Sequence, residues 1–275
     1  MTRFVVVPQW QGSPAARAML LIDGAEAIAG DLPRASVRID VPLEAGESLG
    51  SPVRRLSSLT RIRDLVAAEL ADHAQQSGGD EPTIVIGGDC GVAVPAIAHA
   101  ATRHPGMAVV WFDAHADLHS PDTSPSGAFA GMALRAVFGD GELSAGGAVG
   151  ADRIVLAGAR EFEDAESALV QTAGIRVVAV AEFAEPSALA DAVTATGADA
   201  VYIHVDLDVL DPAVMTGLTS AVPFGLAVAQ VTAAIAALRE RLPLAGASVC
   251  GFAPATPAGA VDDLGSILRI VGALA

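Results

Sequence analysis

The sequence predicts an α/β fold with a mostly parallel central sheet and helices on both of its faces. Three observations support this prediction. Short runs of β-branched residues alternate with longer Ala- and Leu-rich stretches over the whole length of 275 residues. Some of the short runs, such as Met107–Phe112, are apolar throughout, as is typical of strands buried on both faces of a parallel sheet. No linker or internal repeat interrupts the alternation, so we expect residues 1–275 to form one domain.

The strands are predicted from short apolar runs, and the helices from apolar residues at helical spacing. In the helix expected over Leu56–Gln76, Leu59 and Ile62 share one side and the charged residues lie elsewhere. The expected strands are Phe4–Val7, Thr83–Ile86, Met107–Phe112, Ile154–Ala157, Val177–Val180, Val201–Val205 and Ala247–Phe252. The other expected helices are Val92–Arg103, Ser187–Thr196, Val228–Leu242 and Asp262–Leu274.

Composition and charge exclude several classes of protein. With 52% hydrophobic and 17% charged residues, the chain is not intrinsically disordered. A net charge of −16 argues against a nucleic-acid partner, which would require a basic face. Two cysteines, Cys90 and Cys250, are too few for a disulfide framework or a Cys-rich zinc module. All the basic residues are Arg, so Schiff-base chemistry on a lysine is excluded as well.

The mean hydropathy of +0.49 raises the question of a membrane segment. The apolar residues are largely Ala, in short stretches interrupted by Asp, Arg, Gly or Pro, and no run reaches about 18 apolar residues. The N-terminal apolar run is short and becomes polar at Gln9, unlike a signal peptide. We therefore expect a soluble, cytoplasmic protein without a membrane partner.

Three polar clusters each follow an apolar run that is predicted to be a strand. They are Gly87-Gly88-Asp89-Cys90-Gly91, Asp113-Ala114-His115-Ala116-Asp117-Leu118-His119 and Asp206-Leu207-Asp208-Val209-Leu210-Asp211-Pro212. Because the carboxyl ends of parallel strands face one edge of a sheet, where ligands bind, the three clusters can meet although they are far apart in the sequence.

The spacing within the clusters indicates a metal site. Residues at alternate positions of an extended segment point the same way, so Asp113, His115 and Asp117 present three ligating groups together. Asp206 and Asp208 add two more. So many carboxylates at one edge would repel one another without cations, and a set of acids with one His suits Mn²⁺ or Mg²⁺. Two ions fit this number of acids better than one.

Other interpretations of single residues remain open. An isolated Asp-x-Asp is usually a turn or a helix cap, and it is the combination of clusters that favours a metal site. Cys90 by itself is typical of a small buried hydrophobic residue, and Asp211 before Pro212 of a turn. His204 is a candidate for a position behind the ligands. The remaining histidines outside the clusters are expected on the surface or in packing; these are His73, His99 and His104.

The three clusters and the spacing between them resemble the arginase/agmatinase (ureohydrolase) family over nearly the whole chain. The resemblance implies a three-layer α/β/α arginase-like fold and a site for two Mn²⁺ ions, at which a bridging hydroxide attacks a guanidinium carbon. Carried over by position, it implies six metal ligands, namely Cys90, Asp113, His115, Asp117, Asp206 and Asp208. Five match the family, but Cys90 stands where the family has His. A thiolate is a soft ligand for a hard ion, so we expect a weaker or retuned metal there.

Two further positions depart from the family pattern. Ala130 stands where arginases carry a His that acts as a general acid or base. Gly251 stands where the late strand presents a Glu to the substrate guanidinium. The stretch Thr216–Gly225 also differs from the family's turn.

Other positions that contact the substrate are retained. Glu163 matches the acid that binds the α-ammonium group, and His119 and Ser126 match polar residues near the α-carboxylate. Glu163 also fits a simpler role, with Glu161 and Glu166, at the solvated start of a helix.

This profile resembles the branch of the family that converts Nω-hydroxy-L-arginine to hydroxyurea and L-ornithine in antibiotic biosynthesis. The resemblance implies an Mn²⁺-dependent amidinohydrolase for a small-molecule amino-acid substrate, with Asp117 as the catalytic residue. Two alternatives are a catalytically inactive binding protein with an arginase fold and a hydrolase of another guanidino acid. The sequence stops at Ala275, just after its last predicted helix, without the extension that helps arginases to form trimers, so we expect a monomer.

Overall fold

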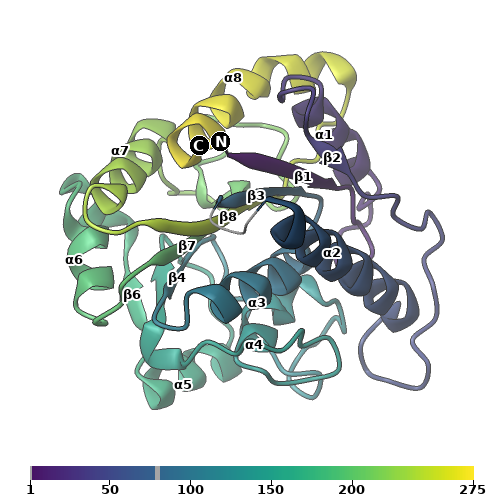
Figure 1. The fold of residues 1–275 in the computed structure, drawn as a ribbon, viewed down its shortest axis with the longest axis horizontal. Coiled ribbons are helices and arrows are strands. Elements are labelled where there is room, and N and C mark those ends of the chain that lie inside the picture. The colour runs from purple at the N-terminus through teal and green to yellow at the C-terminus, as the bar shows by residue number, and fades with distance from the viewer. Residues whose placement is uncertain (1, 78–80) are drawn as a thin grey trace.

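An eight-stranded sheet runs through the centre of the molecule (Figure 1). The structure is a computed structural model and describes residues 2–77 and 81–275. The strands are β1 Arg3–Val7, β2 Val37–Arg38, β3 Thr83–Gly87, β4 Ala108–Phe112, β5 Ile154–Ala157, β6 Arg176–Val178, β7 Val201–Asp206 and β8 Leu244–Cys250. They pair in the order β2-β1-β3-β8-β7-β4-β5-β6, and every pairing is parallel. The predicted parallel sheet is therefore confirmed.

Helices cover both faces of the sheet, which confirms the predicted three-layer architecture (Figure 1). One layer contains α1 Leu20–Ala29, α6 Ala188–Thr194, α7 Val228–Arg239 and α8 Pro257–Leu274. The other contains α2 Leu56–Ser77, α3 Ala93–Arg103, α4 Ala133–Val137 and α5 Asp164–Ala173. Short 3₁₀ helices are η1 Cys90–Val92, η2 Ala130–Met132, η3 Ala151–Arg153, η4 Val180–Ala184 and η5 Leu207–Val209.

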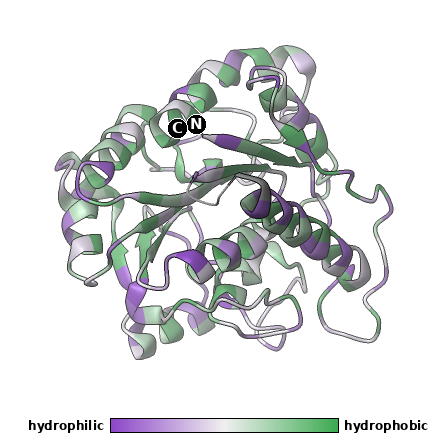
Figure 2. Ribbon diagram, in the orientation of Figure 1, coloured by the Kyte–Doolittle hydropathy of each residue, from purple (hydrophilic) through white to green (hydrophobic). Residues whose placement is uncertain are grey.

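The residues of the central strands alternate between two hydrophobic cores. On β4, Val109 and Trp111 pack into the core beneath α2–α5, and Val110 and Phe112 into the core beneath α6–α8. All four side chains are fully buried, and each contributes about 1.5–3 kcal/mol through its burial. Figure 2 shows the central strands as largely hydrophobic and the helices with polar residues along their length.

Four elements were not predicted from the sequence. They are α1, β2, α4 and α5. Helix α1 begins after Met19 with no side-chain cap, and β2 is a two-residue edge strand. Helix α4 has only five residues. The first three segments are short or uncapped and carry little local signal, because packing on the rest of the protein stabilises them. Helix α5 is different, because it begins with a capping box formed by Glu163 and Glu166.

The boundaries of several other elements differ from the prediction by one to five residues. Strand β6 is Arg176–Val178 instead of Val177–Val180, because a 3₁₀ helix begins at Val180. Strand β8 is Leu244–Cys250 instead of Ala247–Phe252. It includes Gly246, where a Cβ atom would lie only 3.0 Å from the Tyr202 ring. Helix α8 begins at Pro257, where the Thr256 side chain caps it by accepting a hydrogen bond from the Gly259 amide.

The strand order determines where the polar clusters lie. Strand β8 is inserted between β3 and β7, and β4 follows β7 on its other side. The carboxyl ends of β3, β8, β7 and β4 are therefore neighbours along one edge of the sheet. Within the described part of the chain, no helix combines the length and the apolar character needed to span a bilayer.

Candidate metal centre

A cavity of about 640 Å³ lies at this edge of the sheet. Each residue predicted for the site lines it, from the carboxyl ends of β3, β4 and β7 and from the loops that follow β3, β4, β5 and β7. The set is Cys90, Asp113, His115, Asp117, His119, Ser126, Glu163, Asp206 and Asp208. The topology therefore brings together side chains from segments more than 100 residues apart.

Backbone hydrogen bonds hold the acids of the two central loops in place. Asp113 accepts a hydrogen bond from the His115 amide at 2.7 Å, and Asp206 accepts one from the Asp208 amide at 2.9 Å. The Ala114 amide donates to Asp208 at 3.0 Å and joins the loop after β4 to the loop after β7. In each loop, therefore, a carboxylate accepts a hydrogen bond from the amide two residues further along the chain.

The ligating atoms form two adjoining groups that share Asp113. One group is Cys90, Asp113 and Asp117, and the other is Asp113, His115 and Asp208, with ligand atoms within 4.8 Å of one another in each. Asp206 lies next to the first group, with its Oδ2 2.9 Å from the Cys90 Sγ. Two adjoining groups with a common carboxylate can hold two neighbouring divalent ions.

The electrostatics of the site also fit bound cations. Burial, followed by repulsion from a neighbouring acid, raises the pKa of Asp206 and Asp208 to about 6. The same effects raise the pKa of Asp117 well above its usual value. Burial opposes protonation of His115, but its contacts with Asp113 and Asp208 outweigh that effect and raise its pKa to about 12. Without an ion, these acids therefore retain their protons to a higher pH than usual, and a bound metal would favour their ionised form.

Asp117 supplies a second observation in favour of metals. Its Oδ2 atom is buried and has no hydrogen-bond partner within residues 2–77 and 81–275. Its backbone has φ = 54°, in the left-handed region that costs energy for a residue with a side chain. A buried carboxylate oxygen that faces a cluster of acids and accepts no hydrogen bond is suited to a cation.

At the other end of the cavity, His119 lies between two glutamates. Its Nε2 is 3.5 Å from Glu163 Oε1 and 3.8 Å from Glu166 Oε2. Glu163 is the N-cap residue of α5, and its side chain is 59% exposed. Glu166, in the first turn of the helix, is buried. Glu166 accepts hydrogen bonds from the amides of Leu118 and Glu163. Glu166 therefore positions the loop, and Glu163 is the acid available to a ligand.

Ser126 lies on the loop before η2 and lines the same cavity. Its Oγ accepts a hydrogen bond from the Ala128 amide at 3.1 Å. The loop is fastened to the preceding part of the chain, because the Arg54 amide donates to the Gly127 carbonyl at 2.8 Å. Gly127 has φ = +64°, which glycine adopts without strain.

Ala130 and Gly251, the positions at which the family resemblance implies a His and a Glu, also line the cavity. Ala130 begins η2, and Gly251 follows β8 with φ = +86°. A Cβ at Gly251 would lie 2.2 Å from Asp206 Oδ1. This backbone therefore has no room for any side chain at Gly251 unless Asp206 moves.

Several residues near the site were not identified as functional from the sequence. Asp89 accepts hydrogen bonds from the Gly12 and Gly91 amides and from the Gln9 side chain. Glu166 could have been found from its position three residues after Glu163, the spacing of a capping box. Thr219 lines the cavity from the loop after β7, where the sequence carries no recognisable signal.

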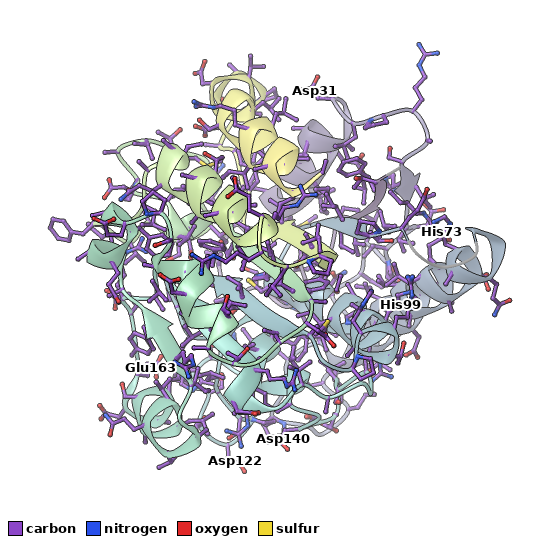
Figure 3. All side chains as sticks on the ribbon, turned by 60° about the vertical axis from the view of Figure 1, so that its left-hand side comes forward. Asp31, His73, His99, Asp122, Asp140 and Glu163 are labelled. Atoms are coloured by element: carbon purple, nitrogen blue, oxygen red, sulfur yellow. The ribbon has the colours of Figure 1, made fainter. Side chains whose placement is uncertain are left out.

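The residues assigned to structural roles lie where that assignment predicts. Asp211 is a turn residue, because its side chain accepts hydrogen bonds from the Ala213 and Gly225 amides. Figure 3 shows His73 and His99 on the other side of the molecule from Glu163. His204 lies behind the cavity wall, fully buried.

A parallel α/β sheet with an edge of carboxylates arranged for two divalent ions defines a class of metal-dependent hydrolases. Residues 27–263 match the model of the arginase family, and the chain belongs to this family. It is therefore an amidinohydrolase of guanidino substrates from a family that depends on a binuclear metal centre.

Two curated relatives illustrate the similarity. The chain is 30% identical over 239 residues to the N(omega)-hydroxy-L-arginine amidinohydrolase of Streptomyces lavendulae, which covers 84% of this chain and 83% of that protein. It is 30% identical over 203 residues to the arginase of Bacillus caldovelox, with 68% and 67% covered.

Solved structures show the same fold at lower identity. The arginase of Entamoeba histolytica, in complex with L-ornithine, superposes with a TM-score of 0.82 at 20% identity and covers 99% of this chain and 97% of that one. The arginase of Bacillus subtilis superposes with a TM-score of 0.81 at 21% identity, covering 99% and 98%.

Proposed function

We propose that this protein hydrolyses Nω-hydroxy-L-arginine to hydroxyurea and L-ornithine with two Mn²⁺ ions. The observation that carries the proposal is the backbone at Gly251, which lines the cavity and leaves no space for a side chain. A guanidinium cation bound there finds no carboxylate at the position where the family resemblance implies a Glu. The similarity to the Streptomyces lavendulae enzyme supports the same substrate.

The chemistry of the substrate fits this lack of an acid. An N-hydroxyguanidine is less basic than a guanidine, so a larger fraction is neutral at neutral pH. A neutral, electrophilic carbon depends less on a carboxylate to hold it, whereas the guanidinium of arginine loses a charge-assisted hydrogen bond. The site should therefore favour the hydroxylated substrate over arginine.

The donors of the site suit Mn²⁺ at most positions. Cys90, Asp113, Asp117 and Asp206 would hold one ion, and Asp113, His115 and Asp208 the other. Carboxylates and an imidazole are appropriate ligands for Mn²⁺, and Cys90 is the soft exception. When bound, such a pair lowers the pKa of a shared water so that hydroxide is available at neutral pH.

The protein's own residues would orient the reaction. Asp117 Oδ2 lies buried without a hydrogen bond in the described chain, so it can accept the proton of the attacking water and hold that water in line. Glu163 would bind the α-ammonium group of the substrate, and His119 and Ser126 its carboxylate end. Ala130 cannot donate a proton, so the leaving amine of ornithine would receive one from Asp117 or from solvent.

Product identification with a panel of guanidino compounds tests the proposal. Purified protein is freed of metal with a chelator, incubated with or without Mn²⁺, and given Nω-hydroxy-L-arginine, L-arginine or another guanidino acid. We expect hydroxyurea and ornithine only with Mn²⁺, and a much lower rate of urea release from arginine. A higher rate on arginine or on another guanidino acid would refute the substrate assignment. No turnover of any compound with both ions bound would instead indicate a binding protein.

A further inference from the structure

A second group of potential ligands extends behind the cavity from Cys90, which lines it, and consists of two thiols and an imidazole. Cys90 follows β3, Cys250 ends β8, and His204 lies on β7, two residues before Asp206. Their ligating atoms lie within 4.8 Å of one another, and all three side chains are buried. Because β8 lies between β3 and β7, these residues come from three neighbouring strand ends.

The distances bring the two sulfurs and a carboxylate close together. Cys250 Sγ is 3.3 Å from Cys90 Sγ and 3.6 Å from His204 Nε2. Asp206 Oδ2 lies 2.9 Å from the Cys90 sulfur and 3.3 Å from the Cys250 sulfur. Four donor atoms of three chemical kinds therefore lie close together in the protein interior.

His204 is held in the orientation that a metal-ligating imidazole requires. Its ring stacks on Trp111 with centroids 3.7 Å apart, and its Nδ1 lies 2.8 Å from Ser248 Oγ. With Nδ1–H donating to Ser248, the lone pair of Nε2 is left to face Cys250 Sγ, which lies 3.6 Å away. A second nitrogen fixed by a hydrogen bond is typical of histidines that bind metals.

We propose that Cys90, Cys250 and His204 form a binding site for a thiophilic divalent ion such as Zn²⁺, with Asp206 as the fourth donor. In a tetrahedral zinc site, Zn–S bonds of about 2.3 Å and Zn–N bonds of about 2.0–2.1 Å place neighbouring ligand atoms about 3.4–3.8 Å apart. The separation of Cys250 Sγ from His204 Nε2 already lies in this range, and the sulfurs would move apart by a few tenths of an ångström.

This site differs in kind from the oxygen-rich centre in front of it. Thiolates and an imidazole select Zn²⁺, whereas carboxylates suit Mn²⁺. Cys90 and Asp206 border both centres, so the thiophilic ion competes for them with the first ion of the oxygen-rich pair. The inference concerns metal binding alone and does not depend on which guanidino compound is the substrate.

Cobalt titration and zinc X-ray absorption together test the proposal. Reduced, metal-free protein is titrated with Co²⁺ under anaerobic conditions, and thiolate-to-cobalt charge-transfer absorption is recorded in the near ultraviolet. We expect the signal of two thiolates, reduced to about half in Cys250→Ser and retained in His115→Ala, which alters only the oxygen-rich centre. A signal that is the same in Cys250→Ser as in the native protein would overturn the proposal.

X-ray absorption of the native protein with one equivalent of Zn²⁺ keeps the test valid if Cys250→Ser does not fold. Two sulfurs per zinc at about 2.3 Å and one imidazole are expected. One sulfur or none assigns the ion to the oxygen-rich centre and refutes the proposal, as does a Cys90–Cys250 disulfide in protein purified without oxidant.

The hydrogen bond to His204 provides an independent variant. Ser248→Ala should weaken zinc binding by about 10- to 100-fold, because it removes the partner that orients the imidazole. The matched control is Ser58→Ala, another buried serine, which lies in α2 away from the sulfurs. Equal zinc affinity in the two variants would contradict the assigned role of His204.

Discussion

Single residues at the edge of the sheet carry the chemical character of this site. Gly251 is the clearest example, because its left-handed backbone and its closeness to Asp206 exclude any side chain. Asp117 is another, with a buried oxygen that faces the other acids. At both positions the identity of one residue determines what can be bound, so substitutions there should affect activity more than stability.

Gly251→Ala should reduce metal binding and activity. The added methyl group would lie 2.2 Å from Asp206 Oδ1 and displace this carboxylate, and a φ of +86° adds strain for alanine. We expect at least about a tenfold loss of Mn²⁺ affinity, measured by isothermal titration, as for loss of an orienting contact. The control is Gly265→Ala on the exposed side of α8, where nothing lies within 4 Å of the new Cβ. It should be neutral or stabilise the helix by up to about 1 kcal/mol.

Asp117→Asn should lower kcat by about 10²–10⁴-fold, because an amide cannot accept the proton of the attacking water. Steady-state kinetics with saturating Mn²⁺ measure the effect, and metal content is checked in parallel. Asp122→Asn changes an exposed acid five residues further along the same loop and should leave kcat unchanged (Figure 3). A kcat for Asp117→Asn close to that of the native protein would rule out its role as the base.

At the scale of the elements, loops after the strands hold the site, and Arg160 ties several of them together. It follows β5, and its guanidinium donates to the carbonyl groups of Gly158, Asp208, Val209, Leu210, Val222 and Pro223. Arginine is suited to this role, because its five N–H groups have a fixed geometry. The loop after β5 is thereby joined to the long loop after β7 at two places, at Asp208 and again at Val222 near Thr219.

Arg160→Ala should lower the free energy of unfolding by about 2–4 kcal/mol, because several carbonyl groups lose their donor. Urea denaturation of the metal-free protein measures this change. Arg176→Ala removes an exposed arginine side chain that, among the described residues, donates one hydrogen bond, at 3.5 Å to the Ala195 carbonyl. It should change stability by less than about 0.5 kcal/mol. Similar losses in the two variants would show that Arg160 does not hold the loops together.

At the scale of the whole molecule, the concentration of acids at one edge links folding to metal and to pH. The pKa of Asp206 and Asp208 is raised to about 6, above that of the same groups in an unfolded chain. Without metal, these groups stabilise the folded state below about pH 4, and the stabilisation is lost as pH rises through about 6. Bound ions reverse this pH dependence of stability, because they bind to the ionised form of the carboxylates.

The increase in Tm on addition of Mn²⁺ should therefore be larger at about pH 7.5 than at about pH 5. Differential scanning calorimetry at both pH values, with and without chelator, measures it. A potassium salt at the same ionic strength, in place of Mn²⁺, is the control. An increase in Tm that does not depend on pH would contradict the role assigned to the buried carboxylates.

Local sequence was sufficient to predict most of the sheet and the cavity-lining acids. Continuous apolar runs identify strands buried on both faces, and alternate spacing in Asp113–Asp117 and Asp206–Asp208 places carboxylates on one side of an extended segment. These are properties of short stretches, so they can be recognised without the fold. Helix α1 and helix α4 could not be predicted in this way, because their stability comes from packing on the sheet.

The sequence by itself determined which residue types stand at the strand ends, and hence the class of metal and the chemistry that the site supports. Only the tertiary structure decided that Cys250 and His204 meet Cys90, because this depends on the insertion of β8 between β3 and β7. The same holds for Gly251, whose conformation and distance from Asp206 arise from strand pairing. Contacts between distant segments depend on strand order, and no short stretch of sequence encodes that order.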